Sequence, residues 1–65
     1  MIKTAIRLQN NTVMVFDRRG KQVPKYQGQY EEVKDNILKD APEDTIFAHG
    51  FNGNGKLLKV SREEW

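Results

Sequence analysis

Residues 29–40, QYEEVKDNILKD, form the one segment of this chain in which apolar residues recur at helical spacing. The apolar stripe comprises Tyr30, Val33, Ile37, Leu38 and Ala41. Glu31 and Glu32 come early in the segment, where carboxylates complement the positive end of a helix dipole. Pro42 disfavours helical geometry at the residue before it and so ends the segment. We therefore predict an α-helix here, with one side packed on a core.

Two strands are predicted before the helix. Residues 2–9 alternate between apolar and polar side chains, which is typical of a half-buried strand, and residues 12–17 form its partner. Asn10 and Asn11 both tolerate positive φ and favour a two-residue turn between the strands. The expected core face then comprises Ile6, Leu8, Val13 and Val15, and the opposite face comprises Ala5, Arg7, Gln9, Thr12, Met14 and Phe16.

A short third strand and a closing hairpin complete the predicted sheet. Asp17 and Gly20 suit a bulged three-residue loop, which leads into a strand at residues 21–23. After the helix, residues 45–51 and 56–60 flank a glycine-rich loop. If Asn52-Gly53 is the turn, Phe47 faces Leu58, and if Gly53-Asn54 is the turn, Phe47 faces Val60. Both registers bury apolar side chains, so this choice stays open.

These elements predict an α+β fold. A single small domain at residues 1–65 would contain a β-meander, one helix packed on a small antiparallel sheet, and a closing β-hairpin, in the order ββ(β)αββ. A chain of this length buries only about 60% of the surface that it exposes when unfolded, so its stability is marginal. The expected core comprises Ile2, Ile6, Leu8, Val13, Val15, Tyr30, Val33, Ile37, Phe47, Leu58 and Val60.

The loop GFNGNGK matches the spacing of a phosphate-binding loop, with Gly50, Gly55 and Lys56 in the required positions. Such a loop needs a hydroxyl residue after the lysine and a helix whose N-terminus faces the phosphate. Leu57 has no hydroxyl, and the residues that follow it are too few for the helix. We predict a hairpin, with no bound nucleotide and no cofactor.

Catalytic and metal chemistry have no evident basis in the sequence. There is no cysteine, and the single histidine, His49, has no recognisable nucleophile or metal-binding partners. The carboxylates Glu31, Glu32 and Asp35 fall on the outward side of the predicted helix. We therefore expect a protein that is not an enzyme. No stretch resembles an export signal or a membrane span, which favours a cytoplasmic protein of bacterial or phage type.

Charge is distributed unevenly along the chain. Residues 1–26 carry a net charge of +5, residues 27–46 carry −4, and residues 47–65 carry +1, which sum to the net charge of +2. Cations near aromatic side chains are typical of surfaces that bind single-stranded nucleic acid. The candidates for such a surface are Arg7, Arg18, Arg19, Lys21, Lys25 and Tyr26. Ordinary solubilising charge explains the same residues, so nucleic-acid binding is the alternative hypothesis.

Apolar side chains on both faces of the first hairpin favour a protein contact. Met14 and Phe16 lie opposite the expected core face, and one short helix can cover only one face well. A partner that binds only the folded state would also stabilise a marginal domain. We predict a binding module that contacts another protein or a second copy of itself through Arg7, Met14 and Phe16, with Phe51 as a further contact.

Overall fold

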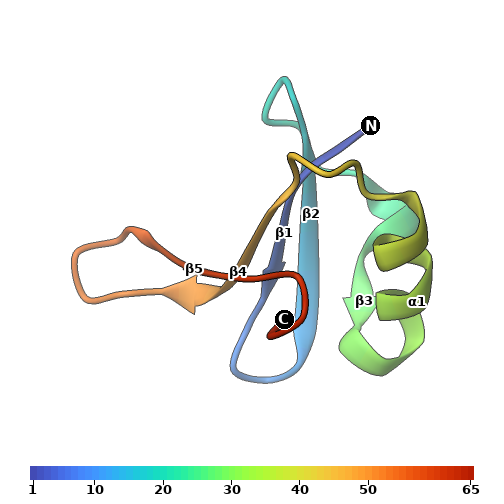
Figure 1. Ribbon diagram of the computed structural model, residues 1–65. Helices are drawn as coiled ribbons and strands as arrows, with labels where there is room; N and C mark the ends of the chain where they lie inside the picture. The colour runs from blue at the N-terminus through green and yellow to red at the C-terminus, as the bar shows by residue number, and fades with distance from the viewer.

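One helix packs against one side of a five-stranded sheet (Figure 1). The computed structural model describes all 65 residues. The strands are β1 (Ile2–Arg7), β2 (Thr12–Asp17), β3 (Gly28–Gln29), β4 (Ile46–Phe51) and β5 (Leu57–Val60). A short 3-10 helix at Pro24–Tyr26 precedes β3, and α1 (Tyr30–Asp40) follows it directly. The predicted α+β class and the predicted helix are confirmed.

The sheet is mixed, with the strand order β3-β2-β1-β4-β5. Neighbouring strands are antiparallel except at the centre, where β1 and β4 run parallel. The prediction of an antiparallel sheet was wrong at this pair. The connection through α1 is long enough to return the chain beside β1 in the same direction, as parallel pairing requires. One half of the sheet is the β1–β2 hairpin with β3 at its edge, the other half is the β4–β5 hairpin, and the parallel pair joins the two halves.

The first hairpin has a different register from the predicted one. Arg7 pairs with Val13 and Ala5 pairs with Val15. The loop has three residues, because the Leu8 amide donates to the Thr12 carbonyl at 2.8 Å and Asn11 adopts a φ of 62°. A single left-handed residue closes a type I turn here, in place of a two-residue turn. The shift by one residue moves every side chain of one strand to the other face.

The predicted division into faces was therefore wrong. Ala5, Arg7, Val13 and Val15 lie on the side of α1, whereas Ile6 and Leu8 lie on the other side with Met14 and Phe16. The third predicted strand, at residues 21–23, is reduced to an isolated bridge between Phe16 and Gln22. Pro24 begins the 3-10 helix there, which stops the strand.

Three loops share one hydrogen-bond pattern. In residues 8–12, 17–21 and 52–56, the first amide donates to the fifth carbonyl and the fourth amide donates to the first carbonyl. The fourth residue is left-handed in each loop, with Gly20 at a φ of 82° and Gly55 at 79°. The predicted bulged loop at residues 17–20 is confirmed.

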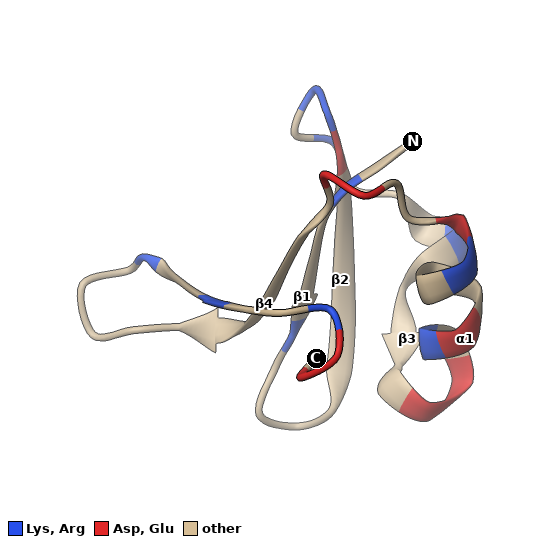
Figure 2. Ribbon diagram, in the orientation of Figure 1, with Lys and Arg blue, Asp and Glu red and all other residues tan.

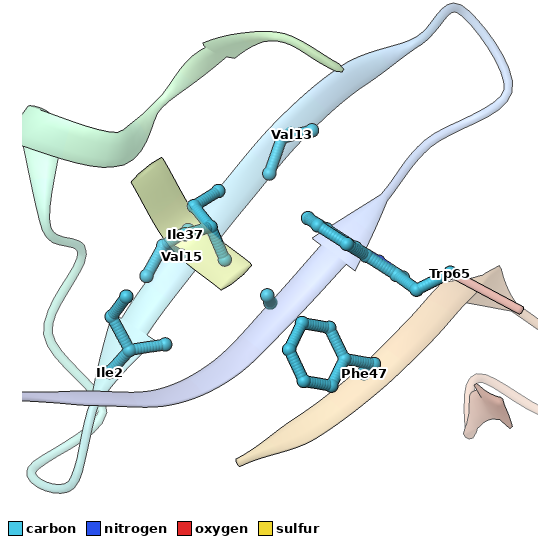
Figure 3. Close-up of a cluster of buried hydrophobic side chains, with 7 residues drawn as sticks. Ile2, Val13, Val15, Ile37, Phe47 and Trp65 are labelled. Carbon is cyan, nitrogen blue, oxygen red and sulfur yellow. The ribbon is translucent and has the colours of Figure 1, made fainter. Parts of the chain in front are cut away.

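The core lies between the sheet and α1 (Figure 3). Its buried members are Ile2, Ala5, Val13, Val15, Ile37, Phe47 and Trp65. A bulge in β1 between Ile2 and Thr4 lets Ile2 and Ala5 point to the same side despite their odd spacing. Tyr30, Val33 and Val60 pack on this cluster as expected. The expected burial of Leu58 was wrong, because its side chain is 45% exposed.

A one-turn segment at the end of the sequence delivers Trp65 to the core. The Ser61 amide donates to the Glu64 carboxylate at 3.4 Å, and the Glu64 amide donates to the Ser61 hydroxyl at 3.2 Å. These reciprocal bonds are those of a capping box. The indole N–H of Trp65 donates to the Ala48 carbonyl at 3.0 Å, and its ring centroid lies 4.9 Å from that of Phe47. The segment covers the part of the sheet that α1 does not reach.

Candidate protein-contact surface

The sheet side that faces away from α1 carries apolar residues without a second layer over them (Figure 1). We call this side the open face. Its apolar residues are Ile6, Leu8, Met14, Phe16, Ile46 and Ala48. Ile6 is 4% exposed and Ala48 is fully buried, yet neither belongs to the core cluster under α1.

Strand pairing places these residues in two rows across the sheet. In one row, Met14 is opposite Ile6 and Ile6 is opposite Ala48. In the other, Phe16 is opposite Thr4 and Thr4 is opposite Ile46. Directly opposed side chains on one face are in contact range, so the rows form an apolar band in which Thr4 is the polar member.

The β4–β5 hairpin extends the open face. Lys59 pairs with Ala48 and ends the first row, and it is the only charged residue among the strand-paired positions of this face. Leu57 lies two residues from Lys59 and so points to the same side, as does its partner Phe51. Phe51 is 54% exposed. An apolar band that ends at Lys59 is the main feature of this surface.

The predicted contact residues do not all lie together. Met14, Phe16 and Phe51 are on the open face, but Arg7 is on the side of α1. The Arg7 guanidinium carbon lies 3.7 Å from the ring centroid of Tyr30. Its nitrogens donate to the Asn11 side chain at 3.0 Å and to the main-chain oxygen of Trp65 at 3.0 Å. Grouping Arg7 with Met14 and Phe16 was therefore wrong, because it followed from the incorrect register.

The residues of the alternative nucleic-acid surface lie in three places, with basic residues in the loop after β2 forming one of them (Figure 2). Arg7 is beside Tyr30, whereas Lys25 and Tyr26 are in the 3-10 helix. Arg18 donates to the Asp44 carboxylate at 2.7 Å, and this contact holds the pKa of Asp44 below its ordinary value. The Tyr26 hydroxyl donates to Asp40 at 2.6 Å, which raises the pKa of Tyr26. Lys25 lies over the Tyr26 ring at 5.3 Å from its centroid.

Arg19 and Lys21 are the members of that set without a side-chain partner. Both are exposed in the loop at residues 17–21, and neither forms an ion pair. Their backbone amides donate to the Asp17 carboxylate, and the bond from Lys21 is the main cause of a lowered pKa at Asp17. The Asp17 carboxylate therefore places a negative charge in the same loop as the two cations.

The glycine-rich loop is part of a hairpin, as predicted. Phe47 pairs with Val60, as in the second of the two registers left open by the sequence, but a bulge between Ala48 and Phe51 shifts the pairing and the loop has three residues in place of a Gly53-Asn54 turn. A strand, β5, follows Lys56 where a phosphate loop would need a helix. His49 Nε2 lies 3.2 Å from the main-chain oxygen of Trp65 and so contacts the segment that closes the core.

No concave pocket is present, and no three His, Cys, Asp or Glu residues are grouped to hold a metal ion. No helix is both long enough and apolar enough to cross a bilayer.

Sequence reasoning missed Ile46, Leu58 and Lys59 as surface features. Ile46 joins the open face only because β4 lies beside β1, which no local pattern indicates. Leu58 follows an apolar neighbour and so gave no clear alternation in its strand. For Lys59 a signal was present, since residues 46–60 contain two lysines and no acidic residue.

No family model, curated protein or solved structure matches this chain.

Proposed function

We propose that this protein is a small non-catalytic binding module that acts through protein contact, with another protein or with a second copy of itself. The open face is the contact surface. The observation that supports this is the apolar band on the central strands, which lies outside the core and has no layer over it. Apolar patches of this kind on soluble domains commonly mark interaction sites.

The energetics of a small domain favour the same proposal. Met14, Phe16 and Ile46 are half-buried, so a partner would remove further apolar area from water at about 25 cal/mol per Å². A partner that binds only the folded form also shifts the folding equilibrium by mass action. The fraction of protein bound and the free energy of unfolding would then both increase with partner concentration.

Self-association is tested by sedimentation velocity and by amide NMR spectra across a range of protein concentrations. We expect concentration-dependent shifts at Met14, Phe16 and Ile46, weakened at least about fivefold in Phe16→Ser because an aromatic anchor carries much of a contact's energy. Asn36→Ser, at an exposed position of α1, is the matched control. A monomeric wild type together with an unfolded Phe16→Ser variant would show that Phe16 is core and would overturn the open face as a contact surface.

The alternative, nucleic-acid binding, is supported by Arg19 and Lys21 alone. Fluorescence anisotropy with single- and double-stranded oligonucleotides at low salt tests it. Binding that weakens steeply with salt and is lost in Arg19→Ala/Lys21→Ala would favour this alternative, since phosphate contacts release counterions.

A further inference from the structure

The β4–β5 hairpin ends the sheet in a free edge. β5 is the last strand in the order, so one side of residues 57–60 pairs with β4 and the other side pairs with no strand. At the opposite end the edge strand β3 has only two residues. Free backbone groups along an edge strand can pair with an added strand from another chain. Only β5 offers such an edge over a useful length.

The exposed apolar side chains are concentrated on the same hairpin. Apart from Met1, the large apolar residues with high exposure are Phe51 and Leu58. Leu58 and Val60 point to the α1 side of β5, whereas Leu57 and Lys59 point to the open face. An added strand beside β5 would therefore place apolar side chains next to Leu58 and would meet the Lys59 ammonium on its other face.

The hairpin also carries the net charge of the protein. Residues 46–60 contain Lys56 and Lys59 and no acidic residue, which gives +2. The other nine basic residues (11 minus 2) equal the nine acidic residues, so the rest of the chain is neutral. Neither Lys56 nor Lys59 forms an ion pair. The edge is thus basic, and its charges are uncompensated.

These charges argue against a second copy as the partner at this edge. Pairing β5 with β5 of another copy would set one lysine-bearing strand against an identical one. Like charges on directly opposed strands are destabilising, and edge lysines commonly prevent such pairing. A strand with carboxylates opposite Lys59 gains from the same arrangement.

We propose that β5 binds an extended acidic segment of another protein as a sixth strand, in which carboxylate and apolar side chains alternate. The backbone of residues 57–60 pairs with the segment, Lys59 faces its carboxylates, and Leu58 packs against its apolar side chains. The inference rests on the proposed function, in that both require protein contact. It uses the sheet edge at β5, which β1 and β4 separate from Phe16 on β2, so Lys59 variants test it separately from Phe16→Ser.

A fluorescein-labelled octapeptide of alternating glutamate and valine serves as the probe. Its controls are the same peptide with lysine in place of glutamate and a version N-methylated at alternate amides. We expect saturable binding of the glutamate peptide with amide shifts at residues 57–60, at least about fivefold weaker binding of the lysine peptide, and loss of binding on N-methylation. The charge effect follows from cross-strand ion pairing, and the backbone effect from the lost donors.

Charge reversal provides the decisive variant. Lys59→Glu should bind the lysine peptide better than the glutamate peptide, whereas Lys39→Glu, at an exposed position of α1, should keep the wild-type preference. Lys56→Glu is a second variant for the case in which Lys59→Glu does not fold, as judged by its amide spectrum. If Phe16→Ser loses self-association and still binds the peptide, the two surfaces are separate.

Three results would overturn the inference. The first is an absence of amide shifts in β5 at millimolar peptide, and the second is equal binding of the two charged peptides. The third is a wild type that binds neither peptide, together with a Lys59→Thr variant that self-associates. The last result would show that Lys59 only protects the edge from pairing.

Discussion

Trp65 links several parts of this molecule that are far apart in the sequence. Its ring lies against Tyr30 of α1 and Phe47 of β4, and its indole N–H is bonded to β4. Its main-chain oxygen accepts a hydrogen bond from Arg7 at the end of β1. The residue is 3% exposed. This one residue therefore joins the helix to both central strands, to α1 and β4 through its ring and to β1 through its main-chain oxygen.

Trp65→Ala should largely unfold the protein. Truncating a buried aromatic residue typically costs about 3–5 kcal/mol, which is comparable to the roughly 3–5 kcal/mol that a core of this size supplies. Far-UV circular dichroism and urea denaturation at 25 °C measure the loss. Phe51→Ala, at an exposed aromatic, is the control and should change the free energy of unfolding by less than about 0.5 kcal/mol. A two-state Trp65→Ala variant destabilised by less than about 1 kcal/mol would contradict this role.

The role of Trp65 was not predictable from the sequence. It follows a capping-box pattern with too few residues for a helix, so no periodicity assigns it to a core face. The position of Arg7 was equally obscure, because an arginine alternating with apolar residues normally indicates a solvent-exposed side. Here it stacks on Tyr30, whose place beside it depends on the whole sheet.

Among the elements, the loops at residues 8–12, 17–21 and 52–56 repeat one geometry. Gly53 and Gly55 lie in the last of these loops, and comparing them tests whether its fourth position requires a left-handed residue. Gly55 has a φ of 79° and Gly53 does not have a positive φ, and a Cβ at either would meet no atom within 4 Å. Any difference between the two substitutions therefore reports backbone conformation alone.

Gly55→Ala should destabilise the protein by about 1 kcal/mol. Holding an L-residue in the left-handed conformation costs roughly 1–2 kcal/mol. Alanine also lowers the conformational entropy of the unfolded chain, which offsets about 0.4–1 kcal/mol of this cost. Gly53→Ala has only the second effect and should be neutral or slightly stabilising. Urea denaturation followed by tryptophan fluorescence compares them. Equal changes in the two variants would refute the left-handed assignment at Gly55.

Element type was more predictable than element register. The helix was predictable because its apolar residues recur every three to four positions, which a strand does not show. The loop at Asp17 was predictable from Asp and Gly at fixed positions. Asn10 and Asn11 fit both a two-residue and a three-residue loop, and the wrong choice exchanged the faces of β1. Met14 and Phe16 were still placed together, because they lie on one strand and do not depend on its register.

Across the whole molecule, Asp44 forms ion pairs with segments that are far from it in the sequence. It lies in the connection between α1 and β4 and forms ion pairs with Arg18, at 2.7 Å, and with Lys3, at 3.7 Å. The next residue, Thr45, donates from its hydroxyl to the Ile2 carbonyl at 3.0 Å. This connection therefore holds the start of β1 and the loop after β2.

Stability should fall in acid through Asp17 and Asp44. Both carboxyls have a pKa lowered in the folded state, Asp17 by backbone hydrogen bonds and Asp44 mainly by Arg18. A lowered folded pKa gives stability that is present above the unfolded value, about 3.9, and lost as the pH falls through the folded value. Thermal unfolding from pH 7 to pH 2 should therefore show a decreasing Tm below about pH 4.

Asp44→Asn isolates one of these contributions. It should lower Tm at neutral pH and reduce the fall in Tm on acidification, because the variant has no carboxylate to protonate there. Glu43→Gln is the matched control, since Glu43 is exposed and forms no ion pair. Parallel pH profiles for wild type and Asp44→Asn would show that the Arg18 contact does not contribute to stability.

The parallel pairing of β1 with β4 sets the order in which this chain can mature during its synthesis. Thr4 lies beside Ile46, so β1 leaves the ribosome well before the strand that covers its second edge has been made. The hairpin of β1 and β2 closes a short loop and can form early, whereas contacts distant in sequence form slowly. Until β4 and Trp65 emerge, the nascent hairpin exposes both an apolar face and a free edge, a combination that attracts chaperones and other nascent chains.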